Sequence, residues 1–145
     1  MPTVSETAAT KRILIVEDSE GQGFLFKSEF RGVYETVLAI DGETALAHLP
    51  PGRAPEFALA IVDLNLPERA GRIPTFDEGI KILSALQELQ NKFGKPLIMV
   101  MVSAVVGREL RERVGAFTIV CVLEKPFSLT GLRQQVERLL GDDVG

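Results

Sequence analysis

The fold is decided by the stretch FALAIVDLNLP (57–67), in which an apolar run, 57–62, ends at the acidic residue Asp63. The run lacks the alternation of polar and apolar residues that marks a half-exposed strand. It is therefore typical of a strand buried on both faces of a parallel sheet. Further apolar runs occupy 13–16, 97–102 and 119–123, and a weaker candidate covers 36–40. We expect five strands, four of them buried on both faces.

Helical patterns fill the intervals between these runs. The expected helices cover 42–49, 79–90 and 108–114, together with one that follows Asp18 and one that begins at the N-cap Ser128. The side chains expected to face inward are Leu25, Phe26 and Phe30 in the first helix and Leu132, Val136, Leu139 and Leu140 in the last. Because strands and helices alternate, we predict a doubly wound α/β fold with its functional crevice at the carboxyl ends of the strands.

The composition allows one compact domain. The chain has 145 residues, of which 46% are hydrophobic and 25% charged, and this length is too short for two ordinary domains. Acidic residues outnumber basic ones by 20 to 16, so the net charge of −4 argues against binding of nucleic acid phosphates. We expect the domain over 11–142, after a flexible lead-in at 1–10.

Signals for export, membrane insertion and thiolate chemistry are weak. The apolar stretch 97–106 is too short for a membrane span, and 13–16 is too short for a signal peptide. A single cysteine, Cys121, cannot form an internal disulfide or a cysteine zinc site, and we interpret it as a core residue. The single histidine, His48, is interpreted as a surface or partly buried residue. A cytoplasmic location with no membrane contact is expected.

Charged and polar residues follow the predicted strands at their carboxyl ends. Glu17 and Asp18 follow the first strand, Asp63 the third, Ser103 the fourth and Lys125 the fifth. If the fold is as predicted, these residues converge on one crevice. Three carboxylates held together repel one another unless a cation neutralises them, and oxygen ligands without histidine or cysteine favour Mg²⁺. The lysine and the hydroxyl would then hold phosphoryl oxygens, so the set predicts a phosphoryl site.

Five motifs extend this pattern over nearly the whole chain: ILIVED (13–18), AIDGETAL (39–46), LAIVDLNLP (59–67), MVMVSA (99–104) and LEKPFS (123–128). In this order they resemble the receiver domain of two-component response regulators. The resemblance implies a flavodoxin-like (βα)5 fold with strand order 2-1-3-4-5. It also implies a phosphorylation-dependent signalling switch, in which Asp63 accepts a phosphoryl group from a sensor histidine kinase or a histidine phosphotransfer protein. Beyond its own phosphorylation and dephosphorylation, the chain is not expected to be an enzyme.

The resemblance also assigns roles to single residues. It implies that Asp18 and Asp63 bind Mg²⁺ through their carboxylates, Asn65 through its main-chain carbonyl and Glu17 through water. It implies that Lys125 and Ser103 bind the phosphoryl group, that Ala104 keeps space beside it, and that the Lys125–Pro126 peptide is cis. The expected output is binding of a downstream protein at the surface formed by the fourth helix, fifth strand and fifth helix. A homodimer is compatible with this scheme.

Three features depart from the receiver pattern, one of which is the segment 115–125, which lacks the acidic pair usual after Gly-Ala and is a few residues longer. Val122 stands three residues before the lysine, where many receivers have an aromatic residue that swings inward on activation. An insertion at about 68–78 lengthens the loop after the third strand and carries Arg69, Arg72 and Phe76. We interpret it as a solvated surface insertion, and hold a role in covering the site or binding a partner as the second interpretation.

Two other functions compete with the switch. The first is a Mg²⁺-dependent phosphohydrolase with an aspartyl-phosphate intermediate. Such enzymes usually carry a second acid two residues after the nucleophile, and here that residue is Asn65, which cannot transfer the proton. The second is a receiver-like interaction scaffold with altered switching, which the valine at position 122 favours and the complete set of charged residues disfavours.

Overall fold

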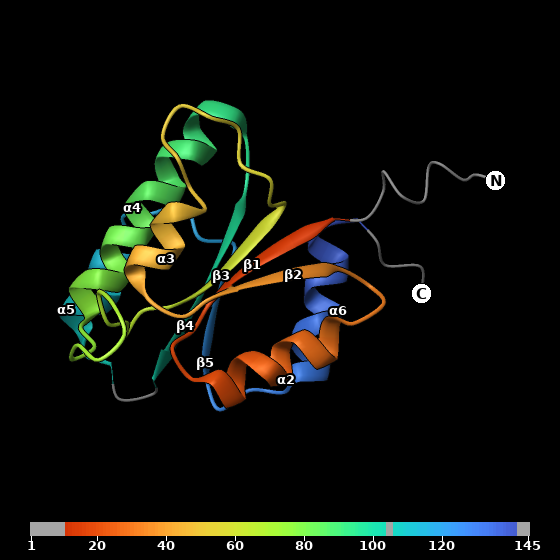
Figure 1. Cartoon of the computed structure of the whole chain (residues 1–145), viewed down its shortest axis with the longest axis horizontal. Helices are drawn as coiled ribbons and strands as arrows, with labels where there is room; N and C mark the ends of the chain where they lie inside the picture. Colours follow the sequence, from red (N-terminus) through yellow and green to blue (C-terminus); the bar gives the residue numbers. More distant parts are fainter. Residues whose placement is uncertain (1–10, 104–105, 142–145) are drawn as a thin grey trace.

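A parallel five-stranded sheet in the order β2-β1-β3-β4-β5 forms the centre of the molecule (Figure 1). The structure, a computed structural model, describes residues 11–103 and 106–141. The strands are β1 (Arg12–Val16), β2 (Glu35–Ala39), β3 (Leu59–Asp63), β4 (Leu97–Ser103) and β5 (Cys121–Lys125). The helices are α2 (Glu20–Phe30), α3 (Gly42–Ala47), α4 (Phe76–Phe93), α5 (Arg108–Val114) and α6 (Leu129–Leu139). The predicted doubly wound fold and strand order are confirmed.

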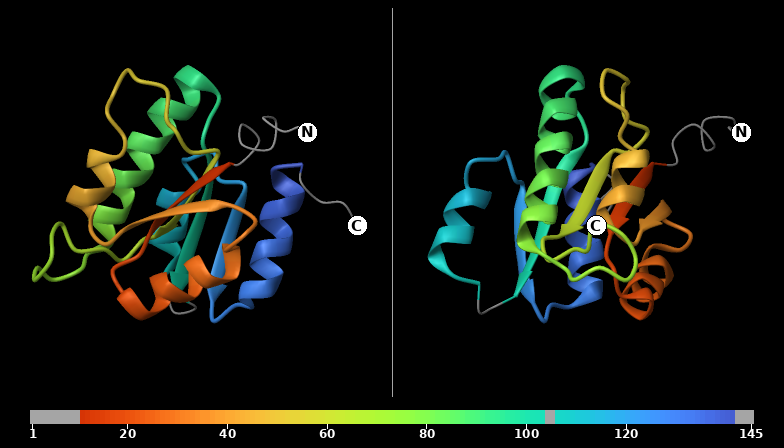
Figure 2. Two further views of the ribbon diagram at one scale, coloured as in Figure 1. Left: turned by 45° about the vertical axis from the view of Figure 1, so that its right-hand side comes forward. Right: turned by 60° about the vertical axis from the view of Figure 1, so that its left-hand side comes forward.

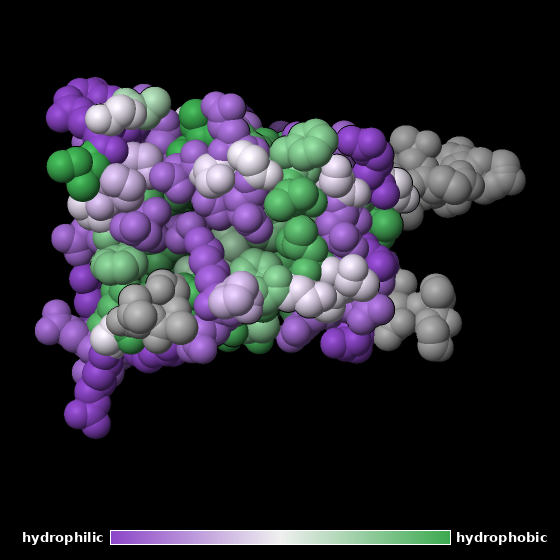
Figure 3. Space-filling model, turned by 90° about the horizontal axis from the view of Figure 1, so that it is seen from below, coloured by the Kyte–Doolittle hydropathy of each residue, from purple (hydrophilic) through white to green (hydrophobic). Residues whose placement is uncertain are grey.

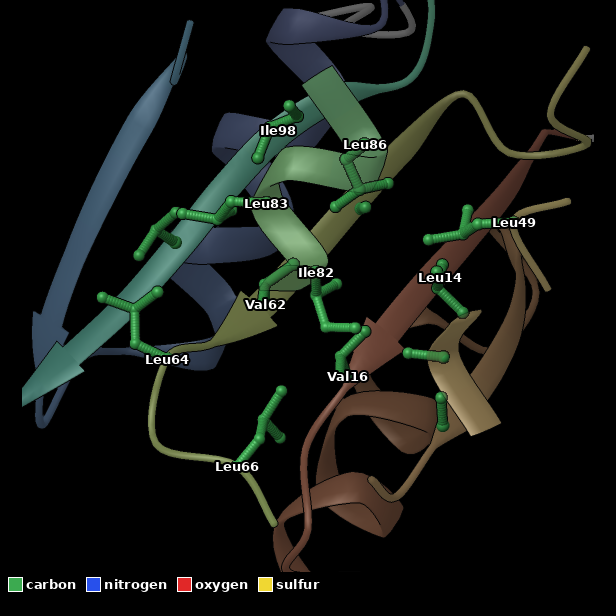
Figure 4. Close-up of a cluster of buried hydrophobic side chains, with 14 of the residues drawn as sticks. Leu14, Val16, Leu49, Val62, Leu64, Leu66, Ile82, Leu83, Leu86 and Ile98 are labelled. Carbon is green, nitrogen blue, oxygen red and sulfur yellow. The ribbon is translucent and has the colours of Figure 1, made fainter. Parts of the chain in front are cut away.

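Helices cover both faces of the sheet, with α3, α4 and α5 on one side and α2 and α6 on the other (Figures 1 and 2). Side chains of each strand point alternately to the two faces, because strand residues alternate in direction. In β1, Leu14 and Val16 join the buried cluster under α4, whereas Ile13 and Ile15 join the cluster under α2 and α6. Figure 4 shows strand residues of the first cluster meeting Ile82, Leu83 and Leu86 of α4.

The parallel register brings the carboxyl ends of the strands to one edge of the sheet. Val16 lies opposite both Ala39 and Val62, and farther along the sheet Ser103 lies opposite Lys125. Figure 3 views the molecule from this side, where hydrophilic side chains cover most of the surface and apolar patches lie between them. No helix within 11–103 and 106–141 is long and apolar enough to cross a membrane.

The prediction for the fifth strand was wrong in position and burial. The strand begins at Cys121 and ends at Lys125, two residues later than expected, and its residues alternate between half-buried and exposed. It is an edge strand that pairs only with β4, and Val122 is 47% exposed on its surface. Cys121 is accordingly half-buried rather than a fully buried core residue. A run of apolar letters therefore did not distinguish an edge strand from a central one.

The helices differ from the predictions in smaller ways. Leu25 of α2 is exposed, and Gly23 faces the sheet in its place, close to the side chain of Leu38. In α6, Leu132 and Val136 are buried, but Leu139 and the C-cap Leu140 are only half-buried. The expected flexible lead-in at 1–10 lies outside the described residues.

Helix α4 begins at Phe76, three residues before the predicted start. The Thr75 side chain accepts a hydrogen bond from the Glu78 main-chain N–H at 3.2 Å, which caps the helix inside the segment read as an insertion. The helix ends at Phe93, and the C-cap Gly94 has a φ of 80°, the left-handed conformation expected of a glycine in this place.

Candidate functional site

Three carboxylates gather at the carboxyl-end edge of the sheet. Glu17 and Asp18 follow β1 directly, Asp63 ends β3, and one oxygen from each lies within 4.8 Å of the others. Glu17 and Asp63 are buried, whereas Asp18 is exposed. This cluster follows from the topology, because β1 and β3 are neighbours in the sheet although their acids are 45 residues apart in sequence.

Both carboxylate oxygens of Asp63 accept hydrogen bonds. Its Oδ1 accepts from the main-chain N–H of Asn65 at 3.1 Å, and its Oδ2 accepts from Lys125 Nζ at 2.7 Å. The first bond is local and the second links β3 to the end of β5, which is not its neighbour in the sheet. These two bonds fix the direction in which the carboxylate faces.

Glu17 carries the least satisfied oxygen of the cluster. Its Oε2 accepts a hydrogen bond from the Ser19 N–H at 3.2 Å. Its Oε1 is buried, has no hydrogen-bond partner among the described residues, and lies 3.9 Å from Lys125 Nζ. Burial, and then the charge of Asp63, raise the pKa of Glu17 to about 7. A cation bound at the cluster would therefore stabilise the charged form of Glu17.

Lys125 supplies a positive charge to the cluster. Burial alone would lower the pKa of its ammonium group, but the hydrogen bond to Asp63 and the charges of Asp63, Glu17 and Asp18 outweigh burial and raise that pKa. The lysine is thus protonated at neutral pH. One ammonium opposite three carboxylates leaves an excess of negative charge.

The cluster opens into a cavity of about 270 Å³. Its lining residues are Glu17, Asp18, Asp63, Asn65, Phe76, Met101, Val102 and Lys125. Apolar groups therefore form part of the wall around the acids. From the sequence, Phe76 was expected in a solvated surface insertion, and a role of that insertion in covering the site was the second interpretation; the cavity lining favours the second interpretation for Phe76.

The remaining predicted residues lie around this cavity or outside the described structure. The main chain of Ser103 ends β4 opposite Lys125, whereas the side chain of Ser103 and all of Ala104 lie outside the described part. The Lys125–Pro126 peptide is cis, as the resemblance implied. Val122 lines a different cavity, of about 390 Å³, between β5 and α5.

The insertion is exposed along its length but fixed at its base. Residues 68–77 are exposed, so this segment lies on the surface. Leu66 and Thr75 pair as an antiparallel bridge. The Leu66 N–H donates to the Thr75 carbonyl with an N to O distance of 3.1 Å, and the Thr75 N–H donates to the Leu66 carbonyl at 2.8 Å. The Gly42 N–H donates to the Pro67 carbonyl at 2.9 Å, which ties the same base to α3. The loop projects beyond the edge of the sheet that carries the acids (Figure 2).

Solved structures share this architecture. A CheY-like response regulator receiver domain protein from Methanospirillum hungatei aligns with a TM-score of 0.72 and 21% identity, over 92% of this chain and 96% of that chain. This chain has the receiver-domain fold. A signal receiver domain from Vibrio parahaemolyticus aligns with a TM-score of 0.70 and 22% identity over 91% of each chain. The chemotaxis protein CheY4 of Vibrio cholerae gives 0.67 and 24%, over 90% of this chain and 98% of that one.

Comparisons with protein-family models and with curated proteins gave no match. The similarity to receiver domains therefore lies in the backbone fold, because the sequence identity to the three named structures is only 21% to 24%. Within that fold, this chain carries an acidic cluster beside a lysine at the carboxyl ends of the strands.

Proposed function

We propose that this chain is a phosphorylation-dependent signalling switch in which Asp63 accepts a phosphoryl group from a phosphohistidine. The donor is a sensor histidine kinase or a histidine phosphotransfer protein. The observation that carries the proposal is the environment of Asp63, which is held by Asn65 and Lys125 within a cluster of two further acids. The receiver-domain fold supports the same role.

The donor set suits a hard divalent cation, and Mg²⁺ is the ion we propose. Three carboxylates contribute oxygens within 4.8 Å of one another, and the buried Glu17 Oε1 lacks a hydrogen-bond donor among the described residues. The carboxylates of Asp18 and Asp63 and the carbonyl of Asn65 would hold the ion, with Glu17 acting through water. When bound, Mg²⁺ supplies positive charge that offsets the carboxylates and the incoming phosphoryl oxygens.

The transfer itself requires little covalent chemistry from the protein. A carboxylate oxygen of Asp63 forms a bond to phosphorus while the bond from phosphorus to the histidine nitrogen breaks. The electron pair stays on that nitrogen, which takes a proton from solvent and leaves as imidazole. Asn65 and Lys125 hold the carboxylate in place before transfer, so the chain contributes orientation and charge.

The added phosphoryl group places about −1.5 to −2 charge at the end of β3. Lys125 then binds a phosphoryl oxygen in place of Asp63 Oδ2, Ser103 supplies a hydroxyl from the end of β4, and Ala104 leaves space for the group. The response passes to the surface formed by α5, β5 and α6, where a downstream protein binds. Val122 lies on this surface and has no ring to rotate, so the change is carried by other residues.

Intact mass after incubation with Mg²⁺ and acetyl phosphate tests the proposal. The unmodified chain should gain one phosphoryl group, and EDTA or Asp63→Asn should abolish the gain. Asp41→Asn is the matched control, because Asp41 is also buried and also follows a strand, yet lies outside the cluster, and asparagine can still cap α3. A gain that survives Asp63→Asn, or no gain in the unmodified chain, would overturn the proposal.

A further inference from the structure

Phe76 lies between the cluster cavity and helix α5. It lines the cavity that contains Glu17, Asp18, Asp63 and Lys125. It also lines a second cavity, of about 450 Å³, whose other lining residues are Asp77, Gly107, Glu109, Leu110 and Arg113. The side chain is 39% exposed. Phe76 is therefore shared by the cavity at the acids and the cavity beside α5.

Four contacts next to Phe76 hold the start of α4 in this position. The Leu66–Thr75 bridge closes the insertion immediately before it, and the Thr75 cap begins α4 at Phe76 itself. Three residues later, Gly79 packs so closely on the main chain that an added Cβ would lie 2.1 Å from the Leu64 carbonyl oxygen. Asp77 forms an ion pair with Arg113 of α5 at 3.0 Å. The ring is thus carried by a fixed helix terminus.

We propose that Phe76 limits the access of water to the phosphoryl group on Asp63 and so prolongs the life of the phosphorylated state. This inference rests on the proposed function. In hydrolysis, a water oxygen forms a bond to phosphorus, the bond from phosphorus to the Asp63 oxygen breaks, and Asp63 leaves as a carboxylate. The products are inorganic phosphate and a proton released to solvent. An apolar ring at the wall removes positions from which water can approach, and exclusion of water protects reactive intermediates.

In this proposal the end of the loop, at Phe76, shields the phosphoryl group, whereas the exposed tip of the loop does not. Ile73 at the tip is 83% exposed and lines neither of the two cavities that Phe76, at the end of the same segment, lines. Substitutions at these two positions separate shielding of the phosphoryl group from a general effect of changing the loop.

The test measures loss of the phosphoryl group after loading with acetyl phosphate and Mg²⁺ and rapid removal of the donor. Phe76→Ala should shorten the half-life of the phosphorylated chain by roughly three- to tenfold, because the wall is opened to water. Phe76→Leu, which keeps an apolar side chain of intermediate size, should restore most of the lifetime. Ile73→Ala is the matched control and should decay like the unmodified chain.

The outcomes separate the two proposals. If Asp63 is phosphorylated and Phe76→Ala decays at the unmodified rate, or if Ile73→Ala decays equally fast, shielding by Phe76 is wrong while the proposed function stands. If the unmodified chain gains no phosphoryl group, the proposed function fails and shielding fails with it. Should Phe76→Ala not fold by circular dichroism, the lifetimes of Phe76→Leu and Phe76→Trp decide: equal lifetimes overturn the inference, and a longer lifetime for tryptophan than for leucine supports it.

Discussion

At the scale of single residues, Glu17 links the charge of the site to the stability of the fold. Its pKa is about 7 in the folded chain, because it is buried beside Asp63, against an ordinary value of 4.5. Between pH 4.5 and pH 7, Glu17 is therefore mostly protonated in the folded chain and mostly ionised in the unfolded chain. The free energy of unfolding therefore falls as pH rises through this window, by roughly 2–3 kcal/mol for this one group.

Glu17→Gln should remove this contribution. In EDTA, urea unfolding should give similar free energies for the variant and the unmodified chain near pH 4.5. Near pH 7.5 the variant should be more stable by roughly 2–3 kcal/mol, because the amide carries no charge to bury. Glu88→Gln, at an exposed position of α4, is the control and should show no such divergence. A difference between variant and parent that does not change with pH would contradict the prediction.

At the scale of elements, helix α4 packs closely on the main chain of Leu64, the residue that follows Asp63. The Cβ absent from Gly79 is what allows the helix to approach the Leu64 carbonyl. Gly79→Ala should destabilise the chain by about 2–3 kcal/mol, since a rigid main-chain atom must move to admit the methyl group.

Ser84→Ala provides the comparison for this prediction. Ser84 is exposed in the middle of the same helix, where alanine is the better helix former, so stability should be unchanged or slightly higher. Urea denaturation of both variants makes the measurement. A Gly79→Ala protein as stable as its parent would show that α4 can shift away from β3.

The elements also show what the sequence can predict. Helix α5 lies at the predicted bounds, and Ser128 caps α6 as expected, because both signals are local. The start of α4 was missed because its cap, Thr75, sits in a loop closed by a tertiary bridge. In α2, Phe26 and Phe30 are buried as predicted, but Leu25 is exposed. Gly23 lies close to Leu38 of the sheet instead, and hydrophobicity does not register such a contact.

The same distinction applies to the candidate site. Glu17, Asp18, Asp63 and Lys125 lie together because the carboxyl ends of parallel strands share an edge, and that rule needs only the strand assignment. Phe76 could not be placed, because its approach to the acids depends on hydrogen bonds between Leu66 and Thr75 rather than on a strand end.

At the scale of the whole molecule, the sheet is covered unevenly. Strand β5 lies at the edge, and the space between it and α5 contains the cavity of about 390 Å³. Its lining is mostly apolar and includes Val102, Val114, Phe117 and Val122. Val122 is 47% exposed beside this space, so a larger side chain at this position would extend over its apolar lining.

Val122→Phe should therefore raise the melting temperature, with a gain in stability of about 1 kcal/mol from filling the cavity. Val33→Phe is the control: Val33 is 38% exposed in the turn before β2 and lines none of the cavities described here, so the added ring should gain nothing. Thermal unfolding followed by circular dichroism compares the two. Equal or lower stability of Val122→Phe would mean that the cavity cannot accept a ring without moving α5.

The closed loop between Leu66 and Thr75 is also a place at which the chain can be lengthened. Its ends are joined by main-chain hydrogen bonds, its tip turns at Gly71 with a φ of 89°, and the cost of extending a closed loop grows only with the logarithm of its length. A fluorescent protein spliced in at that tip would leave every strand connection intact. Because Phe76 at the end of the same loop lines the cavity of the acids, the fluorescence of such a fusion before and after phosphorylation would report whether the loop moves.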